Sequence, residues 1–66
     1  MEAIKISLAA ARVNAGLTQK ELGVLCDVSE STIINWESGR SFPSVKKLSD
    51  LEKALGMSIN YIDFRR

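Results

Sequence analysis

A single cysteine and no histidine in a chain of 66 residues limit the ways in which this chain can hold a fold together. An internal disulfide needs two cysteines, and the zinc sites of small domains are built from cysteine and histidine. A domain of this size buries only about 60% of the surface that its unfolded chain exposes. We therefore expect one domain, residues 1–66, that is stabilised by tight helix packing and by dimerisation.

The composition also excludes classes of function. Without histidine the chain lacks the commonest general base, so we predict that it is not an enzyme and that it holds no metal or other cofactor. No apolar run approaches the ~20 residues of a membrane span, and the first residues do not have the layout of a signal peptide. A cytoplasmic protein without a membrane partner is therefore expected. Nine basic and eight acidic residues give a net charge of +1, which points to no particular partner.

Helix start and stop signals divide the chain into five short helices. Serine or threonine stands at the expected N-caps, and a glycine follows three of the predicted helices. Thr18 and Glu21 have the spacing of a capping box. The pattern predicts an all-α, five-helix fold with helices over about 3–15, 19–26, 30–38, 45–55 and 59–64. The expected inner face of the fourth helix is Val45, Leu48, Leu51 and Leu55.

Residues 17–22, 28–40, 43–44 and 54–58 carry motifs that resemble the lambda-repressor-like (Cro/C1-type, XRE) helix-turn-helix family. The resemblance extends over about residues 8–62 and covers four of the predicted helices. It implies that helix 19–26 crosses the DNA backbone and that helix 30–38 is the recognition helix in the major groove. Asp27 stands where the family usually has glycine, and Gly23 stands where it prefers alanine. Both departures are expected to leave the fold intact, since Asp tolerates a left-handed turn and Gly is small.

The resemblance assigns roles to two sets of residues. The base-reading positions are Glu30, Ser31, Ile34 and Asn35. Asparagine can pair with adenine, glutamate can accept from cytosine, and Ile34 either meets a thymine methyl or lies on neighbouring side chains. The alternative for Glu30 is that it complements the helix dipole. The phosphate-contacting positions are Thr18, Gln19, Ser29, Ser38, Arg40, Ser41 and Lys46, for which the alternative is a solvated side chain or a cap. Lys47 is expected on the same face as Lys46.

Other residues are assigned to the scaffold. Arg12 and Glu37 match a pair that forms a partly buried ion pair in several members of the family. Trp36 is expected in the core rather than as a platform for bases, and Cys26 is expected to be a buried structural thiol. Dimerisation is assigned to apolar residues late in the chain, and the alternative is that they close the core. The dimer candidates are Phe42, Pro43, Ile59 and Ile62.

The leading interpretation is a sequence-specific regulator, a Cro-like or prophage-type repressor that binds a double-stranded DNA operator as a homodimer. Two alternatives remain open. One is an antitoxin-type regulator that binds its operator and a toxin, and the other is a protein-interaction module that uses the same fold. The net charge of +1 and the acidic Glu30 keep the last alternative open.

Overall fold

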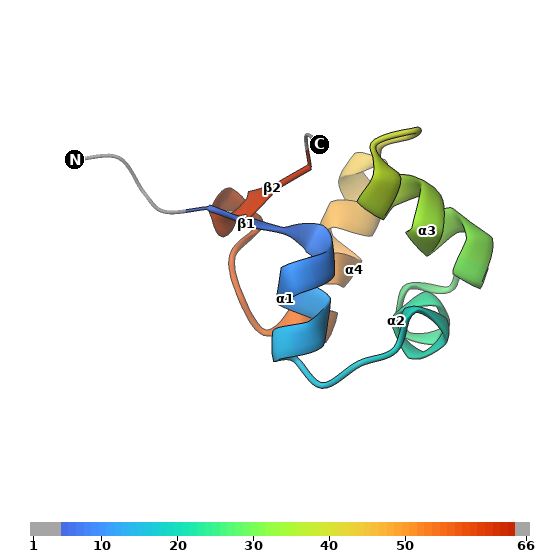
Figure 1. Cartoon of the computed structure of the whole chain (residues 1–66), viewed down its shortest axis with the longest axis horizontal. Helices are drawn as coiled ribbons and strands as arrows, with labels where there is room; N and C mark the ends of the chain where they lie inside the picture. Colours follow the sequence, from blue (N-terminus) through green and yellow to red (C-terminus); the bar gives the residue numbers. More distant parts are fainter. Residues whose placement is uncertain (1–4, 65–66) are drawn as a thin grey trace.

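The computed structural model describes residues 5–64. Within this range four α-helices are followed by a 3-10 turn, and one very short strand lies near each end of the range. The elements are β1 (Ile6–Ser7), α1 (Leu8–Asn14), α2 (Gln19–Cys26), α3 (Glu30–Ser38), α4 (Val45–Leu55), η1 (Ile59–Tyr61) and β2 (Ile62–Asp63). Figure 1 shows α2 and α3 together on one side of the molecule, with the paired strands on the other. The expectation of a helical fold is confirmed, but the count of five helices is wrong.

The predicted bounds of the three central helices are confirmed, because their caps are local. The Thr18 hydroxyl accepts the Glu21 backbone N–H at 3.0 Å, and Glu21 Oε1 accepts the Thr18 N–H at 2.8 Å, so the capping box is closed in both directions. The Ser29 hydroxyl caps α3 by accepting the Thr32 N–H at 3.1 Å. Gly39 ends α3 with a φ of 80°, a conformation that suits glycine.

The prediction of a first helix over 3–15 is wrong at its start. Helix α1 begins at Leu8, because the Ser7 hydroxyl accepts the Ala10 N–H at 3.0 Å and so acts as the N-cap. Ile6 and Ser7 are extended and pair with β2, which leaves them no part in a helix. The part of the predicted helix before residue 5 lies outside the described residues.

The predicted fifth helix is also wrong. Only Ile59–Tyr61 form a helical turn, of the 3-10 type, after which Ile62–Asp63 form β2. This strand pairs in parallel with β1, in a register that places Ile6 opposite Ile62 and Ser7 opposite Asp63. Ile62 is 4% exposed, so extension of the chain brings this side chain into the core and also closes the short sheet.

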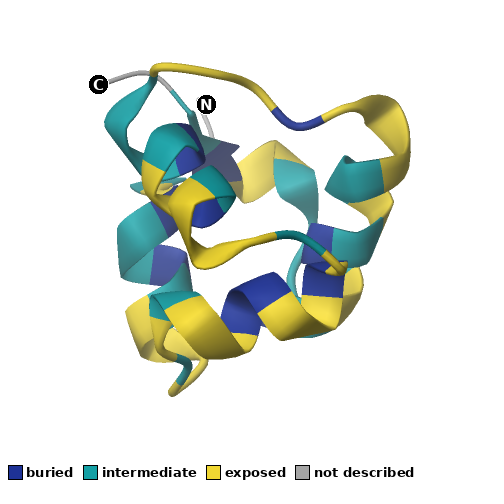
Figure 2. Ribbon diagram, turned by 90° about the vertical axis from the view of Figure 1, so that its right-hand side faces the viewer, coloured by how far each residue is buried: buried dark blue, intermediate teal, exposed yellow. Residues whose placement is uncertain are grey.

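The core lies between the four helices and β2. Its buried members are Leu8, Ala11, Leu22, Cys26, Ile33, Trp36, Leu51, Leu55 and Ile62. Figure 2 shows that every helix carries both buried and exposed positions, as expected of helices with one packed face. The prediction that Val45 lies on the inner face of α4 is wrong, because this side chain is 85% exposed. It lies about 120° round the helix from Leu51, on the first turn, where α4 does not yet face the core.

Candidate nucleic-acid interface

The turn between α2 and α3 brings the two helices unusually close together. Asp27 ends α2 in the left-handed conformation, with a φ of 57°, as the sequence led us to expect. The Val28 N–H then donates to the Gly23 carbonyl at 2.8 Å. A Cβ atom on Gly23 would lie 2.8 Å from the Val28 carbonyl oxygen, which is closer than real Cβ contacts. Alanine, which the family prefers at this position, would therefore force the Val28 backbone to shift, whereas glycine fits the close approach.

Helix α3 presents a continuous face that the core does not use. Ile33 and Trp36 are buried on its inner side, which confirms that Trp36 belongs to the core. The four residues assigned to base reading lie on the other side of the same nine-residue helix. Glu30 and Ser31 are exposed, Ile34 is 41% exposed and Asn35 is half-buried. Their spacing, two adjacent residues repeated one turn later, places them on one side of a helix.

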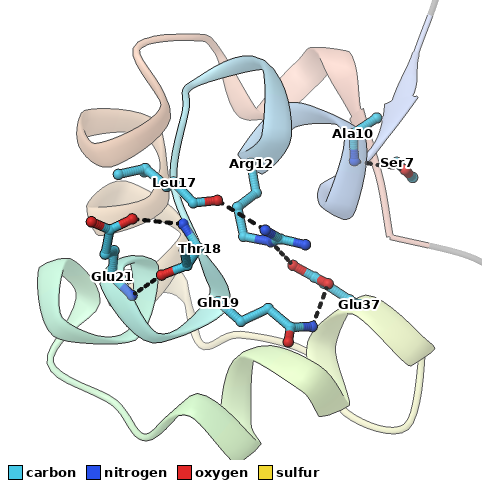
Figure 3. A network of polar contacts seen from close by, with 8 residues as sticks. All are labelled: Ser7, Ala10, Arg12, Leu17, Thr18, Gln19, Glu21 and Glu37. Carbon is cyan, nitrogen blue, oxygen red and sulfur yellow. Dashed lines mark hydrogen bonds and ion pairs between the residues drawn. The ribbon is translucent and has the colours of Figure 1, made fainter.

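A polar network ties α3 to the rest of the scaffold (Figure 3). The Arg12 Nε lies 2.6 Å from Glu37 Oε2, and the other Glu37 oxygen accepts the side-chain N–H of Gln19 at 3.0 Å. Arg12 also donates from its Nη1 to the Leu17 carbonyl at 2.9 Å. The side chains of Arg12 and Glu37 are 15% and 9% exposed, so the ion pair is shielded from water. Glu37 therefore links the last turn of α3 to α1 and to the start of α2.

The residues assigned to phosphate contact fall into two groups. Four of them already have partners within the chain. Thr18 and Ser29 cap helices, Gln19 binds Glu37, and the Ser38 hydroxyl donates to the Asn35 carbonyl at 3.1 Å. A hydroxyl that accepts a backbone N–H keeps its own proton, so the Thr18 cap can still donate to an outside anion.

The second group consists of Arg40, Ser41 and Lys46. All three are exposed, and their side chains make no hydrogen bond or ion pair within the part of the chain that the structure describes. Arg40 and Ser41 follow the C-terminal end of α3, where their backbone N–H groups are bound to the Asn35 carbonyl at 3.0 and 3.4 Å. This bonding fixes the backbone of the loop while the side chains remain free. Arg40, directly after α3, and Lys46, in the first turn of α4, are thus uncommitted cations that follow a helix with none of its own.

Lys47 does not belong to this set, which corrects the expectation that it shares a face with Lys46. Its Nζ donates to the Cys26 carbonyl at 2.8 Å and lies 3.8 Å from an oxygen of Asp50. The Cys26 carbonyl is one of the unpaired acceptors at the end of α2, so Lys47 closes that helix end from α4. The sequence could not reveal this contact, because a lysine in the first turn of a helix also suits a solvated charge.

The dimer candidates are not all on the surface. Pro43 and Ile62 are buried, and Ile59 is half-buried against the core. For Pro43 and Ile62 a role in an intermolecular contact is a wrong prediction, since both side chains are used inside the molecule. Phe42 is 66% exposed and makes an edge-to-face contact with Phe64, with ring centroids 6.4 Å apart. Phe42 is therefore the candidate with most of its side chain available.

Cys26 is fully buried on α2, as expected of a structural thiol. Burial raises the pKa of the Cys26 thiol above its ordinary value, and the nearby Asp50 carboxylate adds to the rise while Lys47 opposes it. Among residues 5–64 no group of three or more His, Cys, Asp or Glu side chains is placed to hold a metal ion. No helix in the same range has the length and apolar content needed to cross a membrane.

Sequence reasoning missed two bonds of the site, those from Gln19 to Glu37 and from Lys47 to the Cys26 carbonyl. The first had a partial signal, because in the family that the sequence resembles the glutamine matching Gln19 also buttresses the recognition helix. The second had none. In both cases the partners lie on different helices, so the contact depends on how the helices pack.

Comparison with known proteins gives consistent matches. Residues 8–62 match the model of a helix-turn-helix family. Over 48 residues the chain is 40% identical to multi-protein-binding factor 1 of Yarrowia lipolytica and 35% identical to endothelial differentiation-related factor 1 of Homo sapiens. Each alignment covers 73% of this chain and 32% of the relative. The chain therefore spans about a third of the length of these relatives.

Proposed function

The chain belongs to the lambda-repressor-like (Cro/C1-type, XRE) helix-turn-helix family, and from this premise we propose that it is a transcription regulator that binds double-stranded DNA sequence-specifically. The family is one of DNA-binding regulatory domains and not of enzymes. In the proposed complex α3 lies in the major groove and α2 crosses the backbone. The observation that carries the proposal is the outer face of α3, where exposed polar side chains stand on a helix whose other face is locked into the core.

The chemistry of that face suits base edges. The Asn35 amide can pair with N6 and N7 of adenine, and the Ser31 hydroxyl can donate or accept. The Glu30 carboxylate can accept from N4 of cytosine, and it stands at the helix N-terminus, where the dipole offsets part of its repulsion by phosphates. Ile34 offers an apolar surface for a thymine methyl. Because α3 contains no lysine or arginine, the common contact of arginine with guanine is not available to it.

Phosphate attraction is assigned to the groups around α3. Arg40 and Lys46 have no partner within residues 5–64, so neither gives up an ion pair on meeting a phosphate. Ser41, Thr18, Gln19 and Ser29 would add hydrogen bonds, and Ser38 would do so after its hydroxyl releases the Asn35 carbonyl. These contacts set the register of the domain on the duplex, whereas the outer face of α3 reads the sequence.

A domain this small makes few contacts with one half-site, so we propose a repressor that acts as a homodimer. Two domains would read half-sites about 34 Å apart on one side of the duplex. Phe42 and the exposed part of Ile59 are the candidates for the contact. Sedimentation with and without operator tests this, and a single domain bound to each site would refute it.

Selection of bound fragments from random duplex DNA at low salt tests the function. We expect enrichment of one sequence, with an affinity that falls steeply as salt is added, by a log–log slope of about −0.9 for each phosphate neutralised. Asn35→Ala should relax the preference at particular base pairs by about 1–3 kcal/mol. Arg40→Ala should weaken all sequences alike and reduce the salt slope by about 1. Absence of enrichment would reject DNA binding, and equal loss of preference in both variants would reject the assigned roles.

A second candidate function is protein binding by the same fold. The observation that favours it is the similarity of the chain to a relative named as a multi-protein-binding factor. A protein-binding module would recover no DNA sequence from the random pool, so the selection experiment separates the two functions.

A further inference from the structure

A shallow groove runs along the outer side of α2 and onto α4. It consists of two hollows of about 390 and 170 Å³ that meet at Leu25. No residue of α3 lines either hollow, so the groove is distinct from the proposed base-reading face. We refer to it as the α2–α4 groove. Its lining residues used below are Leu17, Lys20, Val24, Leu25, Lys53 and Ala54.

The wall that α2 contributes is apolar and exposed. Val24 is 73% exposed and Leu25 is 55% exposed, although the opposite side of the same helix is fully packed. Leu17 and Ala54, both half-buried, extend this surface to the two ends of the groove. Single exposed apolar side chains are common, but apolar residues that gather in one hollow offer a partner a continuous contact. A groove of this kind accepts an amphipathic helix, whose apolar residues recur every three or four positions.

The charges of the groove indicate which kind of helix fits. Its acidic groups are already engaged: Glu21 accepts the Thr18 N–H at 2.8 Å, and Asp50 lies 3.8 Å from the Lys47 ammonium. Its two lysines, Lys20 and Lys53, form no hydrogen bond or ion pair within the described range of the chain. Uncommitted positive charge therefore stands near the apolar wall, one lysine in each hollow. Because these two ammonium groups have no partner within the described residues, they can pair with carboxylates of a bound helix without giving up an ion pair.

We propose that the α2–α4 groove is a docking site for an acidic amphipathic helix of another protein. The apolar stripe of that helix would cover Val24 and Leu25, and its Asp or Glu side chains would meet Lys20 and Lys53. Because the groove includes no part of α3, the bound helix would leave the proposed base-reading face uncovered. The proposal does not depend on DNA binding and survives if that function fails.

A displayed library of random peptides about 15 residues long, close to the shortest length that can hold a helix, tests the proposal against the whole chain. We expect the enriched peptides to combine apolar residues at helical spacing with several Asp or Glu residues. Their affinities would then be measured by fluorescence anisotropy for the chain and its variants. Failure to enrich any peptide, or enrichment of basic ones, would overturn the proposal.

Three variants locate the binding site. Leu25→Ser should weaken the selected peptides by about 10–100-fold, since it removes one large apolar contact. The double variant Lys20→Glu, Lys53→Glu should weaken them by about 10-fold and should favour peptides in which lysine replaces the acids. Val13→Ser is the matched control: Val13 is 63% exposed but lines neither hollow, so the peptides should bind as before.

The outcomes separate this proposal from DNA binding. Leu25→Ser changes no charge and lies off α3, so it should leave any DNA affinity within about twofold while it weakens the peptide. Circular dichroism of each variant checks that the helices remain. If Leu25→Ser lowers the helix content, the test rests on the double lysine variant. Both lysines are exposed, so their substitution should leave the fold intact. Equal binding of the peptides to the double variant and to the unchanged chain would overturn the proposal.

Discussion

The carboxylate of Glu37 connects α3 to α1 and α2 through Arg12 and Gln19. A substitution that removes its charge tests most directly whether these contacts fix α3 in place. Glu37→Gln keeps the size of the side chain. The carboxylate accepts from Arg12 on one oxygen, at 2.6 Å, and from Gln19 on the other, at 3.0 Å. An amide has only one accepting oxygen, so its NH2 group would face one of these two donors. The Arg12 guanidinium would also lose its counter-charge in a site with little access to water.

The magnitude follows from the burial of the pair. Removal of one partner from a buried ion pair costs about 3–5 kcal/mol, because the other charge is left uncompensated. Arg12 and Glu37 keep 15% and 9% of their side-chain surface exposed, and Arg12 retains its bond to the Leu17 carbonyl at 2.9 Å. We therefore expect the lower end, about 3 kcal/mol. A chain of 66 residues has a total unfolding free energy of about 3–10 kcal/mol, so this loss is a large part of its stability.

Urea unfolding of the chain and of four variants measures the effect. In a double-mutant cycle of Arg12→Met and Glu37→Gln we expect the double variant to be more stable than the sum of the single losses predicts, by about 1–3 kcal/mol. Glu30→Gln is the matched control, since it neutralises an exposed acid on the same helix and should change stability by less than about 1 kcal/mol. If Glu37→Gln behaves like Glu30→Gln, or if the coupling is below about 0.5 kcal/mol, the network does not hold α3.

Three further predictions test the helix-turn-helix unit. Gly23→Ala should lower the unfolding free energy in urea by about 1–3 kcal/mol despite the better helix propensity of alanine, because its Cβ would press on the Val28 carbonyl; a stabilised variant would contradict the close approach. Asp27→Gly should raise it by about 0.5–1 kcal/mol, since glycine adopts the left-handed conformation without strain, and a loss of stability would show that the Asp27 side chain contributes there. The raised pKa of the buried Cys26 thiol means that the unfolded chain loses this proton at a lower pH than the folded chain. Stability should therefore hold below the ordinary thiol pKa of 9.0 and decline above it, and Cys26→Ala should remove this part of the alkaline decline; an unchanged pH profile would contradict the shift.

The parts of the fold that could be predicted are those that nearby residues determine. A capping box joins Thr18 and Glu21, three residues apart, and a glycine after α3 supplies the left-handed end. These signals need no knowledge of packing, so α2, α3 and α4 were predicted with the observed bounds. The positions of the base-reading residues on one side of α3 follow from the same local periodicity.

The parts that could not be predicted depend on residues far apart in the chain. Ile6 and Ile62 pair across almost the whole sequence, and a strand of two residues is too short to show an alternating pattern. Because the sequence does not reveal that pairing, its local pattern predicts a helix at both of these segments. The bonds of Lys47 to the Cys26 carbonyl and of Gln19 to Glu37 likewise join separate helices. Their donors look like solvated polar residues in the sequence, and only the packed arrangement gives them partners.

The low net charge of the chain and the fixed ends of α3 both affect a DNA complex. The charge governs its sequence-independent affinity, and the fixed helix governs its sequence specificity. Sequence-independent binding grows with the number of phosphates neutralised, and a net charge of +1 leaves little excess for it. Discrimination would then rest on the placement of the side chains of α3. That placement is fixed at one end by the close contact of Gly23 with Val28 and at the other by Glu37. A helix held at both ends loses little conformational entropy when it binds. Loosening the Glu37 end should therefore reduce the preference for operator over random DNA more than it reduces binding to random DNA, although Glu37 itself touches no base in this arrangement.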